Sequence, residues 1–267
     1  MCTIVVLHRT HPEHPLVVAA NRDELYAREA LSPRPLDEDP RVVAGVDCEH
    51  GGTWMGVHAS GLFVGLTNQR TWHFGERAPR SRGEVALDAL RTGSPEGVRA
   101  VLASIDPREY RSFNLIYGDA GGVEVAYARR DRAEVSVDAL APGLHVLAND
   151  RMGSPHFPKS RRAAELAGAA GVGPWPETVS ALRAMLADHE LPAIDSVPAP
   201  PADADVTHAL ARELQAVCIH TPFYGTRSST ILALDHGRVA RYLFADGSPC
   251  RAPHVDITHL LDTPHPS

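Results

Sequence analysis

The second residue of the chain is a cysteine, and this position allows a chemistry that an internal cysteine lacks. Removal of Met1 is favoured when the next side chain is small, and Cys2 meets that condition. Cleavage would leave a free α-amine on the carbon that carries the thiol. This amine, with a reference pKa of about 7.7–8.0, is a local base for a thiol of about 8.5. We expect Cys2 to be a nucleophile that supplies its own base. The alternative is a small apolar residue at a strand start.

The tetrapeptide Asn21-Arg22-Asp23-Glu24 ends the apolar run that is expected to pair with the segment after Cys2. Hairpin geometry would return these polar residues beside the chain start. The Arg22 guanidinium would then favour the thiolate, and the Asp23 carboxylate could hold and orient the α-ammonium group. The alternative is a solvent-exposed polar strand end.

Three further residues are polar where a core strand would stay apolar. Asn68 follows Leu66-Thr67, Asn149 follows Leu147-Ala148, and Arg227 precedes a β-branched run. An asparagine amide can donate to a developing oxyanion, and an arginine can polarise or anchor an acyl substrate. Taken singly, each of these segments is more often a turn cap or an Asx-turn than the position of a catalytic group.

Metal chemistry is not expected from the sequence. His8, His11 and His14 are spaced by three, but on a hairpin turn this spacing does not place side chains on one face. They therefore suggest surface histidines rather than a zinc site. Four cysteines without a CxxC pair indicate reduced thiols rather than a disulfide frame or a zinc knuckle; they are Cys2, Cys48, Cys218 and Cys250.

Strand hairpins are predicted to position these residues. Segment 3–9 should pair with 15–21, which brings 21–24 beside Cys2. Other hairpins are expected for 53–58 with 62–68, 113–117 with 123–127, 134–137 with 144–148, and 230–234 with 239–244, and single strands around 42–43 and 216–220.

Helices are expected for four segments, of which one opens on the cap Ser94 followed by Pro95. The four are 81–90, 94–105, 159–170 and 177–188. Segment 32–40 is interpreted as a proline-containing loop and 191–205 as a Pro/Ala-rich surface loop. Strands interrupted by helix pairs predict an α+β fold of antiparallel sheets covered by helices, in one domain over 1–267.

Bulk composition excludes several classes of function. The net charge is -7 without a basic block, so nucleic acid is not an expected partner. No apolar run approaches the roughly 20 residues of a membrane helix, so no integral membrane segment is expected. The start of the chain lacks a signal-peptide pattern, and with the few thiols this suggests the cytoplasm.

Several motifs in order along the chain resemble the NRDE family, which includes the transport and Golgi organisation protein 2 homologues. The resemblance spans Cys2 to about Phe244. Its motifs are Met-Cys-Thr-Ile at the start, Ala20 to Glu24, Gly51 to Gly56, Thr67 to Arg70, Ser81 to Glu84, Phe113 to Leu115 and Tyr224 to Thr230.

The resemblance implies a four-layer αββα sandwich similar to the N-terminal-nucleophile hydrolases, near the cysteine acylases of the penicillin V and bile-salt type. By this similarity, Cys2 is expected to be the nucleophile of a linear-amide hydrolase that works through an acyl-enzyme. The implied partners in the site are Arg22, Asp23, Asn68, Asn149 and Arg227. No cofactor is expected.

A retained Met1 would move the α-amine to the wrong residue and remove the basis for this chemistry. The resemblance also supports an alternative, because these homologues are associated with haem handling and acyl-lipid metabolism. Under that alternative the chain is a non-catalytic binding or trafficking protein, with haem or an acyl lipid in the same pocket.

Overall fold

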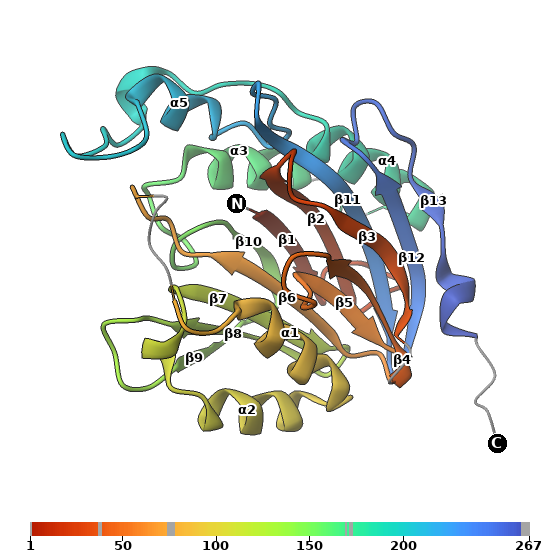
Figure 1. The fold of residues 1–267 in the computed structure, drawn as a ribbon. Coiled ribbons are helices and arrows are strands. Elements are labelled where there is room, and N and C mark those ends of the chain that lie inside the picture. The colour runs from red at the N-terminus through yellow and green to blue at the C-terminus, as the bar shows by residue number, and fades with distance from the viewer. Residues whose placement is uncertain (1, 37–38, 74–77, 169, 171–172, 263–267) are drawn as a thin grey trace.

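Two antiparallel sheets stack face to face and are covered on both outer sides by helices (Figure 1). The structure is a computed structural model that describes residues 2–36, 39–73, 78–168, 170 and 173–262. The four layers run helix, sheet, sheet, helix. This architecture confirms the predicted α+β sandwich.

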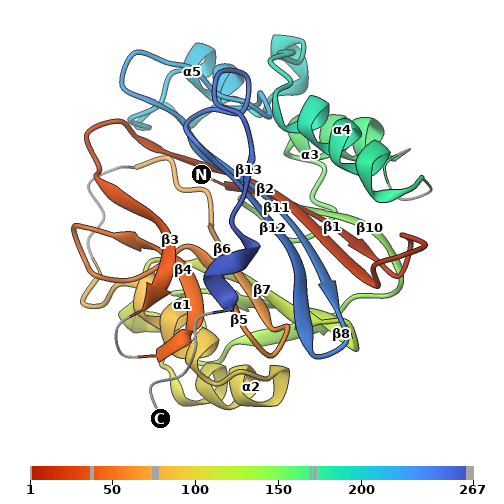
Figure 2. The same cartoon turned by 90° about the vertical axis from the view of Figure 1, so that its right-hand side faces the viewer.

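The first sheet contains the strand that begins at Cys2. In spatial order its six strands are β10 (Gly143–Leu147), β1 (Cys2–His8), β2 (Leu16–Leu25), β11 (Tyr224–Asp235), β12 (Arg238–Asp246) and β13 (Val255–Asp256). Helices α3 (Pro158–Ala167) and α4 (Trp175–Leu186) cover its outer face. Figure 2 shows this helix pair on the side of the sheet away from the second sheet.

The second sheet follows the chain order from edge to edge. Its seven strands are β3 (Ala30–Leu36), β4 (Asp39–Asp47), β5 (Met55–His58), β6 (Phe63–Asn68), β7 (Phe113–Asp119), β8 (Gly122–Ala128) and β9 (Ser136–Ala139). Helices α1 (Arg82–Arg91) and α2 (Pro95–Ser104) cover its outer face. Ser81 and Ser94 cap these helices, as the sequence predicts for Ser94.

The central strands are apolar on both faces because both faces are buried. On β1, Ile4 and Val6 pack between the sheets, whereas Val5 and Leu7 pack under α3 and α4. The same alternation continues on β2. Burial on both sides explains why these strands are continuous apolar runs rather than alternating ones.

The expected loop over 32–40 is partly wrong. Ala30–Leu36 forms strand β3 although it contains Pro33 and Pro35. This strand lies at the edge of the seven-stranded sheet and its pairing with β4 shifts register twice. Prolines are tolerated at such an edge because one side of the strand needs no ladder hydrogen bonds. Residues 37–38 lie outside the described residues.

The expected hairpin of 134–137 with 144–148 is wrong in its pairing, although both strands exist. β9 pairs with β8 in one sheet, and β10 pairs with β1 in the other. The chain crosses between the sheets here, which local sequence signals do not distinguish from a turn. The strand expected at 216–220 is reduced to one bridge between His220 and Gly225.

The chain between α4 and β11 is mostly irregular, as expected for 191–205. It contains a 3-10 turn, Ile194–Ser196, and the short helix α5 (His208–Glu213), which the sequence did not indicate. The other two 3-10 turns are Pro107–Glu109 and Thr258–Leu261. Among the described residues, no helix has the length and apolar character needed to cross a membrane.

Candidate active site

Three neighbouring strands place the predicted residues at one end of the six-stranded sheet. Cys2 on β1 pairs directly with Arg22 on β2, and Arg22 pairs on its other side with Ser228 of β11. Asp23 lies one register position further towards the chain start and pairs with Thr226. The hairpin expected from the sequence therefore brings the tetrapeptide beside Cys2.

Arg22 lies on the inner face of the sheet, together with the Cys2 side chain. The residue two positions earlier, Ala20, belongs to the core between the sheets. The Arg22 guanidinium stacks 4.2 Å from the ring centroid of Trp54, which comes from the opposite sheet. Burial raises the pKa of the Cys2 thiol, and the charge of Arg22 acts in the opposite direction.

Asp23 points to the other face, towards the helix layer. Its Oδ1 accepts a hydrogen bond of 2.6 Å from the Thr226 hydroxyl, and its Oδ2 lies 3.7 Å from Lys159 Nζ. Both side chains of this ion pair are fully buried. Burial raises the pKa of Asp23 and lowers the pKa of Lys159, while each partner's charge opposes the shift of the other.

Two further contacts fix the strand end on this outer face. The Asn21 amide donates to the carbonyls of Leu186 and Val217, at 2.8 and 2.9 Å. The Tyr224 hydroxyl donates to the backbone carbonyl of Asp23 at 2.6 Å. These bonds hold Asp23 from both sides of its strand, so its position is set by the fold rather than by a ligand.

The two predicted asparagines lie at different depths. Asn68, at the end of β6, lines the same cavity as Cys2. Asn149 is fully buried behind it and donates to the Asn68 carbonyl at 2.7 Å. Asn114 holds the Asn149 segment by donating to the carbonyl of Asp150 at 3.0 Å. Asn68 is therefore the asparagine that faces the cavity, and Asn149 supports its backbone.

Arg227 is close in sequence to the site, but its side chain turns away from Cys2. It occupies the register shift between Thr226 and Ser228. Its Nη1 donates to the carbonyls of Leu25 and Tyr26 at 3.1 and 2.6 Å. Arg227 thus braces the chain after β2 in this structure and does not contact the thiol.

A small cavity of about 70 Å³ lies beside Cys2, next to a larger one of about 460 Å³. Four residues line both cavities: Glu24, Arg28, Asn68 and Arg82. The larger volume lies within the range of small-molecule sites. A ligand in the large cavity could thus extend a group towards the Cys2 sulfur.

The large cavity combines an apolar wall with several arginines. The wall comes from α5, from the irregular chain on both sides of it, and from Trp72, which packs against this cluster; its members are Trp72, Val197, Val206, Leu210, Ala211, Leu214 and Phe223. Burial, followed by the charge of Arg111, lowers the pKa of Arg82 to about 10, so Arg82 stays protonated at neutral pH. Among the described residues, no acidic group forms an ion pair with Arg70, Arg82 or Arg111.

Arg82 belongs to the Ser81 to Glu84 motif, but the sequence did not predict it as a site residue. Its position depends on Gly52, where a Cβ would lie 2.5 Å from the backbone of Gly83. The Thr53 N–H also donates to the Gly83 carbonyl at 3.1 Å. This close approach brings the start of α1 against the turn before Trp54, and so places Arg82 in the cavity wall.

Lys159 was also missed, although the sequence carried a signal. It is the single lysine among 26 basic residues. Its side chain is buried in the first turn of α3, where a surface helix would normally expose it. A chain that otherwise uses arginine places its one lysine beside Asp23.

Comparison with known proteins assigns the chain to a family. Residues 1–243 match the family described as Transport and Golgi organisation 2. The chain belongs to the Transport and Golgi organisation 2 family. The Transport and Golgi organization protein 2 homolog of Bos taurus is 31% identical over 240 residues, covering 82% of each chain. The corresponding Homo sapiens protein is 29% identical with the same coverage.

Solved structures with this fold include an acylase and a hydrolase by their names. A penicillin V acylase from Agrobacterium tumefaciens aligns over 96% of this Transport and Golgi organisation 2 family chain and 86% of its own, with TM-score 0.55 and 15% identity. A conjugated bile acid hydrolase from Clostridium perfringens covers 96% and 92%, with TM-score 0.52 and 11% identity. At these identities the likeness shows the fold alone, and it confirms the expected N-terminal-nucleophile hydrolase type.

Proposed function

We propose that the chain is a cysteine amidohydrolase in which Cys2, exposed by removal of Met1, attacks the carbonyl of a linear acyl amide. The observation that carries this proposal is the division of Arg22 and Asp23 between the two faces of one strand end. The guanidinium shares the face of the thiol. The carboxylate lies on the opposite face, from which we expect it to hold the α-amine that loss of Met1 would expose.

In the proposed reaction one proton passes from the thiol to the α-amine and then to the leaving group. The Cys2 α-amine takes the thiol proton, and the sulfur forms a bond to the acyl carbon. The Asn68 amide, which lines the same cavity, donates to the resulting oxyanion. The amide C–N bond then breaks, and the α-ammonium returns the proton to the leaving amine. Water hydrolyses the thioester by the same relay and restores the thiol.

Arg22 and Asp23 have separate roles in this scheme. Arg22 offsets the cost of forming a thiolate in a site where burial raises the pKa of Cys2. Asp23 orients the α-ammonium, and Lys159 keeps the buried carboxylate ionised while that amine is neutral. Both are positioning residues rather than groups that touch the scissile bond.

The cavity supports an acyl amide that also carries a negative charge. The apolar wall around Leu210 and Trp72 suits an aliphatic or aromatic acyl group. Arg82 and Arg111 form no ion pair with an acidic residue among the described residues, although the charge of Glu24 acts on Arg82, and both guanidinium groups suit a carboxylate or another anion. We therefore expect anionic acyl amides to be preferred over neutral ones.

A panel of acyl amides with and without a terminal carboxylate tests this function. Amine release is measured for the wild type, for Cys2→Ala and for the matched control Cys48→Ser, whose thiol is exposed and distant in sequence. We expect release by the wild type and Cys48→Ser only. Equal release by Cys2→Ala, or no release by a wild type shown to begin at Cys2, would contradict the proposal.

The same arginines favour a second candidate function, the binding of an anionic amphiphile without turnover. Haem fits this description through its two carboxylates. Among the described residues, none that lines the large cavity is a histidine, methionine or cysteine, so an axial ligand from this part of the chain would have to be Tyr224, with water as the alternative. Titration with haem, followed by its absorbance, should show binding that Arg82→Gln weakens. Binding unaffected by Arg82→Gln would place haem elsewhere.

A further inference from the structure

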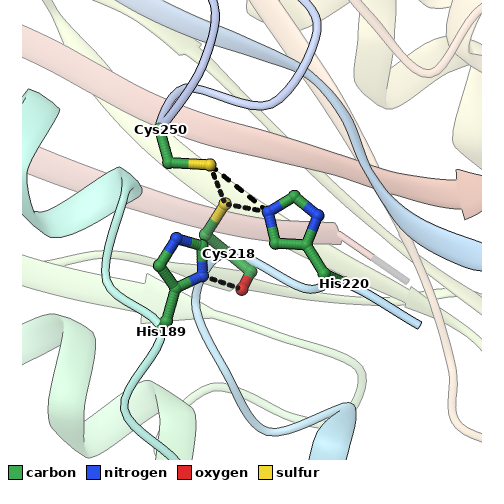
Figure 3. A group of neighbouring side chains, drawn as sticks. All are labelled: His189, Cys218, His220 and Cys250. Atoms are coloured by element: carbon green, nitrogen blue, oxygen red, sulfur yellow. Dashed lines mark hydrogen bonds between the residues drawn. The ribbon is translucent and has the colours of Figure 1, made fainter.

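Two cysteines and two histidines from three separate segments that flank α4, β11 and β12 come together near the protein surface (Figure 3). His189 follows α4, Cys218 and His220 precede β11, and Cys250 follows β12. One ligand atom from each of the four lies within 4.8 Å of all the others. Sequence spacing did not reveal this group, because only Cys218 and His220 are close along the chain.

The separations match a tetrahedral metal site. Cys218 Sγ lies 3.9 Å from Cys250 Sγ and 3.8 Å from His220 Nε2, and Cys250 Sγ lies 3.3 Å from the same nitrogen. Ligands at zinc bond lengths of about 2.3 Å to sulfur and about 2.0 Å to nitrogen leave edges of roughly 3.5–3.8 Å in a tetrahedron. The side chains therefore surround a space of the right size.

The fourth ligand is oriented by the backbone. His189 Nδ1 lies 3.0 Å from the Cys218 carbonyl oxygen (Figure 3). A carbonyl only accepts hydrogen bonds, so Nδ1 carries the ring proton and Nε2 keeps its lone pair. A histidine that ligates a metal commonly donates its other N–H to a backbone carbonyl in this way.

We propose that His189, Cys218, His220 and Cys250 form a structural zinc site. Four protein ligands leave no open position, which is the pattern of structural rather than catalytic zinc. Two thiolates and two imidazoles in a tetrahedron select zinc among the common divalent ions. A disulfide between the cysteines would leave the convergence of both histidines on the same sulfurs unexplained.

The second group of possible ligands in the described chain shows the contrast. Asp47, Glu49 and His50 also lie within 4.8 Å of one another. There the Arg28 guanidinium already fills the place of a cation, 2.7 Å from Asp47 and 3.5 Å from Glu49. In the cysteine–histidine group, none of the hydrogen bonds of the four side chains among the described residues comes from an arginine or a lysine.

The zinc site would brace the carboxylate of the candidate active site. Between two of its ligands, the Ile219 N–H donates to the Thr226 hydroxyl at 2.9 Å. That hydroxyl donates in turn to Asp23 at 2.6 Å. A metal that holds residues 218–220 to His189 and Cys250 therefore fixes the hydroxyl on which Asp23 rests, without touching substrate.

Metal analysis of the full chain tests the site independently of activity. We compare the wild type with Cys250→Ser and His189→Asn, both at exposed ligands, and with the controls Cys48→Ser and His50→Asn. We expect about one zinc per chain in the wild type and controls. Zinc affinity should fall at least about tenfold in the ligand variants, since even outer-shell changes cost that much. Cobalt(II) should give the visible bands of a tetrahedral thiolate site in the wild type and in both controls, but not in Cys250→Ser.

Zinc should also raise the melting temperature of the wild type and of Cys48→Ser, but not of Cys250→Ser. Three results would overturn the proposal. These are substoichiometric zinc with no cobalt spectrum, equal metal retention in Cys250→Ser and Cys48→Ser, or a Cys218–Cys250 disulfide by intact mass in protein purified without air. Because none of these readings depends on turnover, failure of the amidase proposal would leave them unchanged.

Discussion

The two faces of the β2 strand end differ in what they hold. On the inner face, Arg22 stacks on Trp54 beside the Cys2 side chain and borders a cavity. On the outer face, the Asp23 side chain is fully buried against Lys159 and accepts a hydrogen bond from Thr226. Successive residues of a strand point to opposite faces. The adjacent pair Arg22-Asp23 can therefore serve the thiol and the amine of one residue separately.

The difference also separates stability from chemistry. The outer face holds a buried ion pair, and removal of either partner leaves the charge of the other buried without a counter-charge. The inner face holds cations that border open volume and that can change without unfolding the chain. Substitutions on the two faces should therefore change different measured quantities.

The largest effect is expected from breaking the buried ion pair. Lys159→Met leaves the Asp23 carboxylate buried without its 3.7 Å partner, and should lower the free energy of unfolding by about 3–5 kcal/mol. Denaturant unfolding measures this loss. The double variant Asp23→Asn with Lys159→Met should recover a large part of it. A double variant as unstable as Lys159→Met would contradict the assignment of the two residues as a coupled pair.

The next effect concerns the cavity on the inner side. Arg82→Gln removes a charge that has no acidic partner among the described residues, and should lower the preference for anionic over neutral acyl amides roughly tenfold or more. The ratio of the two kcat/KM values measures this. Arg80→Gln, at an exposed arginine two residues earlier, is the control. Equal losses in both variants would show that Arg82 does not face the substrate.

Arg22→Leu should act on the thiol alone. Removal of a nearby cation disfavours the thiolate, so the pKa of Cys2 should rise further and thiol labelling at neutral pH should slow. A pH profile of labelling separates this shift from a general loss of access. An unchanged profile would mean that Arg22 only packs against Trp54.

An effect on stability that depends on pH should come from His254, whose Nε2 lies 3.2 Å from the Ser229 hydroxyl on the outer face. Burial, then the charge of Arg183, lowers its pKa to about 4. Since the unfolded pKa is about 6.5, His254 contributes stability above that pH and loses it as the pH falls from 6.5 towards 4. His254→Asn should flatten this part of the stability curve in urea unfolding. A curve of unchanged slope would contradict the assignment.

The strand pairing near Cys2 could be predicted because its signals are local. Two apolar runs joined by a short polar turn fix which residues of β1 pair with β2, so the contact of Cys2 with Arg22 follows from the hairpin alone. The edge strand β3 was missed because its prolines are compatible with a strand only at a sheet edge. Edge position is a property of the whole sheet and not of the segment.

The parts of the site that were missed depend on long-range contacts. Lys159 reaches Asp23 from α3, and Arg82 enters the cavity because Gly52 meets Gly83. Arg227 was expected in the site from its motif, but a register shift beside it turns its side chain to the Tyr26 backbone. No local pattern encodes any of these three placements.

The central claim is that Cys2 becomes the first residue and carries a reactive thiol. Intact mass after brief treatment with a thiol-directed electrophile near neutral pH tests it most directly. We predict a chain that lacks Met1 and carries one label, located at Cys2 by peptide mapping and absent from Cys2→Ala. A chain that retains Met1, or a Cys2→Ala variant labelled as fully as the wild type, would contradict the claim.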